Sequence, residues 1–214
     1  MINNFTSYIF HPILILCRLW RIIYFPLIYL FNLPLVNHDN MKNAHVLSLV
    51  YSVITSLISP YTFYLVYNNY LLANQINITI SKFVYNLSIS YFISDLSIGI
   101  QYYPNILNNN ILTSYIHHSA YISLLLYGNY YNKIHLFILG MPYEIPTLLL
   151  NLRYIKIYKN HILFGLLFFI FRILYNIFIL YITYNFHNDI FIFSICTMIV
   201  HSYWFINYVK KYLL

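Results

Sequence analysis

Long runs of apolar residues alternate with short polar stretches along almost the whole chain. About 20 apolar residues in an α-helix are enough to cross the hydrocarbon core of a bilayer. Seven segments approach or exceed this length and predict transmembrane helices near 10–33, 45–67, 81–103, 112–129, 133–150, 161–184 and 189–209. The fourth and fifth are the shortest, and only Gly128–Asn132 joins them, so we expect a tight helical hairpin there.

The composition supports this interpretation. Of the 214 residues, 61% are hydrophobic and 7% are charged, whereas a soluble domain carries about 25% charged residues. So few charges cannot cover a surface that faces water, and lipid must replace water over most of the exterior. The sequence therefore predicts an all-α fold, a polytopic bundle of transmembrane helices.

The basic residues outnumber the acidic ones by eleven to four, which gives a formal net charge of +7. They are scattered rather than gathered in a stripe, which argues against nucleic-acid binding and fits contact with lipid headgroups. With seven crossings, one side would hold Lys42, Arg153, Lys156, Lys159, Lys210 and Lys211, and the other Lys82 and Lys133. Because cytosolic loops are rich in Lys and Arg, we expect the C-terminus in the cytosol.

Several ionisable side chains fall within the predicted spans, where a charge costs about 2.5–3.5 kcal/mol on insertion scales. They are Asp95 in the third span, His117 and His118 in the fourth, Glu144 in the fifth, Arg172 in the sixth and His45 at the start of the second. A residue kept at bilayer depth against this cost is a candidate for a functional site, and each needs a partner.

Helical spacing enlarges the set around Glu144. Glu144, Thr147 and Asn151 are three and four residues apart, which places them on one helical face. Pro142 and Pro146 bracket the glutamate, and the carbonyls that they leave without backbone donors need other partners. This pattern is typical of a polar cavity. The residues that we expect to share one cavity are Asp95, His117, His118, Glu144, Asn151 and Arg172.

Two interpretations of these residues stay open. In the first, a buried and fully paired network of Asp95, Glu144 and Arg172 only fixes helix packing. Alternatively the set performs chemistry, because two adjacent imidazoles have little packing value but can act as base, acid, nucleophile or metal ligand. Cys17 and Cys196 stand singly in apolar spans without the spacing of metal ligands, so we predict no metal site.

Taken in chain order, these residues resemble the TLC domain over about residues 40–210. The motifs are Asn43-Ala44-His45, Tyr91-Phe92-Ile93-Ser94-Asp95-Leu96, His117-His118, Glu144 with Thr147, Asn151 and Arg153, Phe168-Phe169-Ile170-Phe171-Arg172, and Tyr203-Trp204-Phe205. The resemblance implies a six-helix barrel around a central cavity in residues 37–214, with one transmembrane helix before it in residues 1–36. It also implies the endoplasmic reticulum or a related endomembrane.

The TLC family includes ceramide synthases, a translocon-associated membrane protein, a cargo receptor of the endoplasmic reticulum and small TLC-domain proteins tied to membrane lipid composition. In ceramide synthases the paired histidines are needed for N-acyl transfer from acyl-CoA to a sphingoid base, a role that would fall on His117 and His118 here. Where the synthase signature has several acids, the stretch 141–147 has one, Glu144. The chain is therefore nearer to the small TLC-domain proteins.

We predict first a protein that binds or remodels membrane lipids, an acyl chain or a sphingolipid, in a central polar cavity. The alternative is an acyltransferase with acyl-CoA as substrate and no bound cofactor, in which His117 or His118 acts as base or nucleophile. Asp95 or Glu144 would orient the imidazole. The substrate-binding candidates are Asn151, Arg172, Thr147 and His45. A cargo receptor or translocon accessory ranks third, followed by a transporter or proton channel. The expected partners are membrane lipids, with a homodimer left open.

Overall fold

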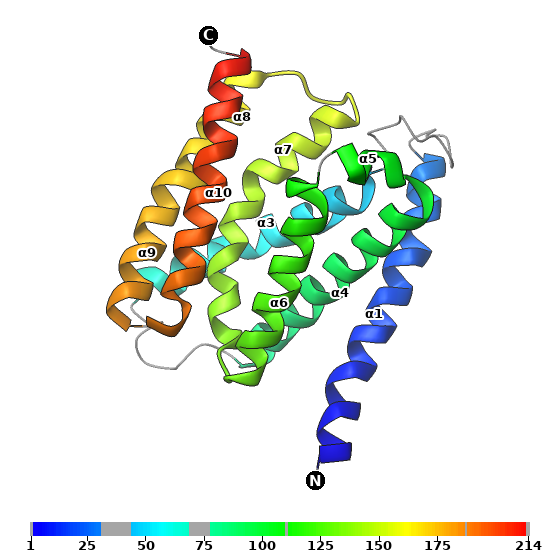
Figure 1. Ribbon diagram of the computed structural model, residues 1–214, viewed down its shortest axis with the longest axis vertical. Helices are drawn as coiled ribbons and strands as arrows, with labels where there is room; N and C mark the ends of the chain where they lie inside the picture. Colours follow the sequence, from blue (N-terminus) through cyan, green and yellow to red (C-terminus); the bar gives the residue numbers. More distant parts are fainter. Residues whose placement is uncertain (1, 31–43, 69–77, 110, 187, 213–214) are drawn as a thin grey trace. The chain divides into compact units, whose positions relative to one another are not determined.

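The computed structural model describes residues 2–30, 44–68, 78–109, 111–186 and 188–212. These residues form helices joined by short turns, and none of them belongs to a strand (Figure 1). The helices are α1 (Ile2–Leu30), α3 (Val46–Tyr67), α4 (Ile78–Tyr102), α5 (Pro104–Asn109), η1 (Leu112–Ile116), α6 (His117–Tyr130), η2 (Ile134–Tyr143), α7 (Glu144–Tyr154), α8 (His161–Phe168), η3 (Phe169–Leu174), α9 (Tyr175–Phe186) and α10 (Asn188–Tyr212). Of these, η1 and η3 are π-helical and η2 is a 3₁₀-helix. The predicted all-α fold is confirmed for this part of the chain.

Five helical stretches of the described chain are long and apolar enough to cross a membrane. They are Pro12–Leu30, Val46–Tyr67, Thr79–Tyr102, His161–Asn185 and Ile190–Tyr212. These match the first, second, third, sixth and seventh predicted spans and fit an integral, multi-pass membrane protein. The fourth and fifth predicted spans fall on runs of mixed winding, η1 with α6 and η2 with α7, and are not among the five. The count of seven crossings therefore stays a prediction.

A short connection, residues 131–133, joins α6 to η2. Asn132 has a φ of 57°, a conformation that asparagine adopts more readily than most residues. The amide of Lys133 donates to the carbonyl of Gly128 at 2.6 Å. A methyl group on Gly128 would lie 2.5 Å from the ring of Phe137, so the two helices approach closely here. The tight helical hairpin predicted at this point is confirmed.

The contacts within the chain divide the described residues into two compact units. The first falls within Met1–Tyr51 and Ile76–Ile138, and the second within Ser52–Gln75 and Leu139–Leu214. Helices α3 and η2 each begin in the first unit and end in the second. The boundary predicted between residues 36 and 37 lies outside the described residues.

In the first unit α1 packs along α4, and α4 packs against α6 (Figure 1). Serines of α4 connect it to α1. Trp20 Nε1 donates to Ser90 Oγ at 3.1 Å, and Arg21 Nη2 donates to Ser97 Oγ at 3.3 Å. Small side chains let transmembrane helices approach closely, and hydrogen bonds between helices then hold them. These bonds fix α1 beside the part of α4 that contains Asp95.

In the second unit α8, η3 and α9 form one continuous helical run, and α10 packs along it (Figure 1). Phe164, Phe168 and Tyr208 form the buried centre of this contact. Gly165 leaves room for it, because a methyl group there would overlap the phenol of Tyr208. Tyr208 Oη also donates to the carbonyl of His161 at 2.7 Å. The close packing places η3 against α10.

Candidate functional site

In the first unit Asp95 and His118 form a buried acid–histidine pair. Asp95 lies in α4, and His118 is the second residue of α6. Oδ2 of Asp95 is 3.0 Å from Nε2 of His118. The two residues are 9% and 8% exposed, so the contact is largely shielded from solvent. The packing of α4 against α6 thus brings together two candidates that lie in different predicted spans.

The two ring nitrogens of His118 have different neighbours. Nδ1 is 2.8 Å from the carbonyl oxygen of Ser114, and a carbonyl only accepts, so Nδ1 donates to it. Nε2 lies 3.0 Å from Oδ2 of Asp95, within the distance of an ion pair but outside the geometry of a hydrogen bond. The imidazole therefore lies between a backbone carbonyl and a carboxyl group.

Aromatic rings surround this pair. Phe92 meets His118 edge-on with ring centroids 5.5 Å apart, and the Tyr91 ring lies at 6.3 Å. Tyr91 in turn stacks on Tyr51 with a centroid distance of 4.0 Å. His117 is half-buried, and its ring lies 5.5 Å from that of His118 at an interplanar angle of 82°. The adjacent histidines therefore differ in environment, and His118 is the one that Asp95 contacts.

In the second unit Arg172 is buried among neutral groups. Its Nε donates to the carbonyl oxygen of Tyr143 at 3.0 Å, and Nη2 donates to Oγ1 of Thr147 at 2.6 Å. The guanidinium also lies over the rings of Phe168 and Trp204, at 5.4 and 5.5 Å from their centroids. Hydrogen bonds and aromatic faces both stabilise a cation in surroundings of low dielectric.

Irregular backbone positions these groups. Pro142 lies in the 3₁₀-helix η2, has no N–H and cannot donate to the carbonyl of Leu139 three residues before it. That carbonyl accepts from Tyr175 Oη instead, at 3.0 Å. Arg172 itself lies in the π-helical segment η3. Such segments are rare in proteins, but those that occur are frequently found at functional sites. The prediction that the prolines leave carbonyls for other partners is confirmed at Leu139.

A second buried network adjoins Arg172, and the sequence did not indicate it. Tyr143 Oη donates to Asn176 Oδ1 at 3.0 Å, and Asn176 Nδ2 lies 3.3 Å from Nδ1 of His201. Nδ1 of His201 is also 3.2 Å from the carbonyl oxygen of Arg172. Without a hydrogen this Nδ1 accepts from the amide of Asn176, and with a hydrogen it donates to the carbonyl of Arg172. The tautomer of His201 therefore determines its partner. The available signal was the spacing of four residues between Arg172 and Asn176.

The other candidates occupy separate places in their units. Asn151 is fully buried in α7, and its Nδ2 donates to Ser52 Oγ at 3.2 Å. Glu144 begins α7, where a negative charge is favourable. The first unit holds His45, Asp95, His117 and His118, and the second holds Glu144, Thr147, Asn151 and Arg172. A single cavity shared by both sets stays a prediction.

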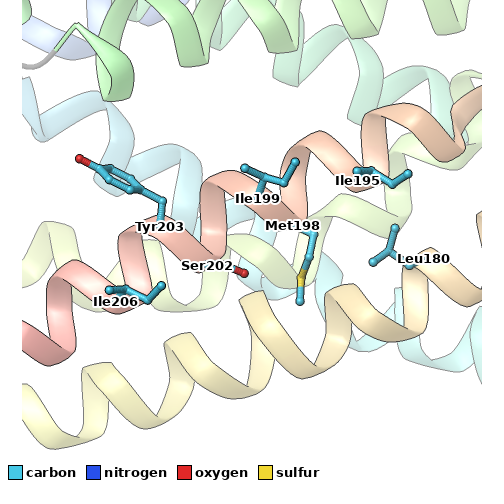
Figure 2. A pocket seen from close by; sticks show the side chains of 7 residues that line it. All are labelled: Leu180, Ile195, Met198, Ile199, Ser202, Tyr203 and Ile206. Atoms are coloured by element: carbon cyan, nitrogen blue, oxygen red, sulfur yellow. The ribbon is translucent and has the colours of Figure 1, made fainter.

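An open apolar groove of about 430 Å³ lies along α9 and α10 of the second unit (Figure 2). It is lined by Leu180, Ile195, Met198, Ile199, Ser202, Tyr203 and Ile206. Apart from the hydroxyls of Ser202 and Tyr203, these side chains are aliphatic, thioether or aromatic, which suits contact with a hydrocarbon chain.

Comparison of the chain with protein-family models, with curated proteins and with solved structures found no match.

Proposed function

We propose that this chain is a multi-pass membrane protein of the TLC type that binds or remodels membrane lipids. In this proposal six helices enclose a polar cavity and one transmembrane helix precedes them. The observation that carries it is the buried contact of Asp95 with His118 at 3.0 Å. The TLC pattern assigns the essential chemistry to the histidine pair, and the contact gives one of these histidines a carboxyl partner.

A purely structural role explains the Asp95–His118 contact less well. Removing two ionisable groups from water costs several kcal/mol for each ion, and well-packed apolar residues often replace such pairs without loss of stability. A carboxyl group beside an imidazole can instead take up or pass on a proton close to a bound ligand. Its aromatic surroundings keep the dielectric low and strengthen the electrostatic interaction.

The groove on α9 and α10 supports a lipid as the ligand class. It presents hydrocarbon side chains beside the hydroxyls of Ser202 and Tyr203. An acyl chain packs against the former, and an ester or headgroup oxygen accepts from the latter. Apolar binding surfaces with a few polar groups are typical of ligand sites in general.

The second candidate function is an acyl transfer from acyl-CoA, and the same contact favours it. An amine or alcohol would attack the thioester carbonyl, forming the new C–N or C–O bond and breaking the C–S bond. The proton lost by the nucleophile would pass through the Asp95–His118 pair to the departing thiolate, so the pair ends in its starting state. The arrangement differs from a serine-protease triad, because Nδ1 of His118 faces a carbonyl and Nε2 faces the carboxyl.

Lipid analysis tests the first function. The protein is purified from its membrane into nanodiscs, and the co-purifying lipids are identified by mass spectrometry for the wild type, Asp95→Asn and His118→Ala. We expect a lipid class that is enriched with the wild type and depleted with both variants. His161→Ala, which changes a histidine of the second unit, is the matched control. If all four proteins carry the bulk lipid composition, lipid binding at this pair is wrong.

Labelled acyl-CoA with a panel of amines and alcohols tests the second function. Turnover by the wild type that falls at least 100-fold in His118→Ala, and not in His161→Ala, would establish a histidine-dependent acyltransferase, since general acid–base catalysis contributes about 10²–10⁴-fold. Absence of turnover with the whole panel would leave lipid binding as the function.

The proposal also places the protein in the endoplasmic reticulum or a related endomembrane, with the C-terminus in the cytosol. The charge distribution supports this orientation, because Lys210 and Lys211 lie in the last turn of α10. Fluorescence microscopy of a tagged chain tests the compartment.

A further inference from the structure

Basic side chains gather in the second unit where α7 and α10 both end. Arg153 lies in the last turn of α7, and Lys210 and Lys211 lie in the last turn of α10. Nη2 of Arg153 donates to Oη of Tyr212 at 2.7 Å, which ties the two helix ends together. The connection from α7 to α8, which contains Lys156, runs past the same end of the unit (Figure 1).

Two of these cations contact the ring of Tyr212. The guanidinium carbon of Arg153 lies 4.5 Å from the ring centroid, and Nζ of Lys211 lies 5.3 Å from it. Arg153 is only a donor, so the phenol accepts from it and keeps its own hydrogen to donate. An anion at this ring would meet two positive charges and an O–H donor.

The acidic side chains of this unit belong to the opposite ends of the same helices. They are Glu144, which begins α7, and Asp189, the second residue of α10. With a rise of about 1.5 Å per residue, Glu144 is about 14 Å from Arg153 and Asp189 about 33 Å from Lys211 along the helix axes. The acids of the unit therefore do not neutralise this cluster.

Lys156 occupies a backbone position that favours glycine. Its φ is 68°, in the left-handed region. Its amide donates to the carbonyl of Arg153, and the amide of Ile157 donates to the carbonyl of Leu152, both at 2.9 Å, which is the Schellman motif at the end of a helix. The attraction of a helix C-terminus for a cation is no larger than the cost of this conformation for a residue other than glycine. A lysine here points to a use for its exposed ammonium group.

Apolar side chains beside these cations indicate a ligand that belongs to a membrane. Ile157, which follows Lys156, is 60% exposed, and Tyr154 is 37% exposed. Lys210 and Lys211 lie at the end of a helix that is apolar enough to cross a membrane, which places them at the level of the lipid headgroups. A free phosphate would contact the cations alone, whereas a phospholipid would also cover the exposed apolar side chains.

We propose that the ends of α7 and α10 bind a phospholipid whose headgroup ends in a phosphomonoester. The residues that bind it are Arg153, Lys156, Lys211 and Tyr212. A phosphomonoester carries about two negative charges and offers three acceptor oxygens, which suit guanidinium, ammonium and phenol donors. The site lies in the unit that does not contain Asp95 and His118, so it goes beyond the proposed function.

Binding of short-chain lipids to the whole protein in an uncharged detergent tests this site. Dioctanoyl phosphatidic acid is titrated by microscale thermophoresis, in parallel with the dioctanoyl forms of phosphatidylserine and phosphatidylcholine and with glycerol 3-phosphate. We expect phosphatidic acid to bind most tightly, and its Kd to rise about fivefold in Lys156→Gly and in Lys211→Gln. Lys82→Gln, which removes an exposed charge from the first unit, is the matched control and should keep the Kd of the wild type.

Lys156→Gly also separates binding from folding. Glycine adopts a φ of 68° without strain, so the Tm of this variant should equal or exceed that of the wild type while its Kd rises. The proposal is overturned if neither lysine variant changes the Kd, if Lys82→Gln raises it equally, or if phosphatidylserine binds as tightly as phosphatidic acid. Equally tight binding of glycerol 3-phosphate would overturn the assignment to a lipid. Asp95→Asn should bind phosphatidic acid like the wild type, so failure here is distinct from failure of the proposed function.

Discussion

Nη2 of Arg172 donates to the hydroxyl of Thr147 at 2.6 Å, and this bond ties the π-helical segment η3 to α7. Both partners lie in the second unit. Nε of Arg172 also donates to the carbonyl of Tyr143, the residue directly before α7. The guanidinium therefore binds the start of α7 at two points, and its position depends on both bonds.

Thr147→Val tests the strength of this bond. Valine keeps the shape of threonine but removes the acceptor, so one donor of a buried cation loses its partner. We expect a loss of about 1–2 kcal/mol in unfolding free energy, since hydrogen bonds to charged groups are strong but those within membranes are weaker than average. Thermal unfolding in nanodiscs measures it. Thr147→Ser retains the hydroxyl and is the control, and equal losses in both variants would contradict the argument.

A double-mutant cycle measures the Asp95–His118 contact. Asp95→Ala and His118→Ala each leave the other group buried without its partner, which is costly, whereas the double variant removes both groups. We expect the double variant to lose less unfolding free energy than the two single variants together, by about 1–3 kcal/mol. Unfolding free energies from denaturant titration in mixed micelles supply the four values.

Lys82→Ala is the control for this cycle. Lys82 is exposed on the same helix as Asp95, and a rise of 1.5 Å per residue places it about 20 Å away. Its effect should add to that of Asp95→Ala within about 0.5 kcal/mol. If the losses of unfolding free energy in Asp95→Ala and His118→Ala also add, the contact contributes no coupling energy.

The close approach of α8 to α10 makes Gly165 sensitive to substitution. The methyl group of Gly165→Ala would overlap the phenol of Tyr208, which a hydrogen bond to the carbonyl of His161 holds in place. Overpacking of this kind costs about 1–3 kcal/mol. Gly140→Ala is the matched control, because a methyl group at Gly140 meets no atom within 4 Å. Thermal unfolding of both variants should show a lower Tm for Gly165→Ala alone. An equal fall of Tm in both variants would mean that overlap with Tyr208 is not the cause, since alanine itself favours the helix over glycine.

The features that the sequence predicts well are those that depend on composition and local periodicity. The helices, and the presence of Asp95 and Arg172 in stretches apolar enough to cross a membrane, follow from the apolar runs alone. The choice of partner does not, because it depends on how helices distant in sequence pack. In the first unit Asp95 contacts His118. In the second unit Arg172 donates to Thr147 and to a backbone carbonyl.

Neutral side chains are the hardest to predict. Tyr24 and Tyr103 are two of 26 tyrosines, and nothing in their local sequence marks them as buried. Asn176 and His201 form a network only because η3, α9 and α10 pack together. A charge at bilayer depth stands out against its cost, but a buried hydroxyl or amide stands out only once its burial is known.

The number of crossings and the orientation can be tested together by cysteine labelling. In a background with Cys17→Ser and Cys196→Ser, Tyr131→Cys places a thiol in the α6–η2 hairpin, and Lys159→Cys places one between α7 and α8. Both native side chains are exposed. With seven crossings and a cytosolic C-terminus, residue 131 lies on the lumenal side and residue 159 in the cytosol.

A membrane-impermeant maleimide should therefore label Lys159→Cys in sealed microsomes, whose outer face is cytosolic, and label Tyr131→Cys only after permeabilisation. Labelling of both in sealed vesicles would mean that the η1–α6 and η2–α7 runs do not cross, which leaves five spans. The reverse pattern would contradict the orientation, and with it the argument that the excess of Lys and Arg marks the cytosolic side. The physical reason for expecting seven is the length of the two runs, because Leu112–Tyr130 and Ile134–Tyr154 are each close to the 20 or so residues that a bilayer core requires.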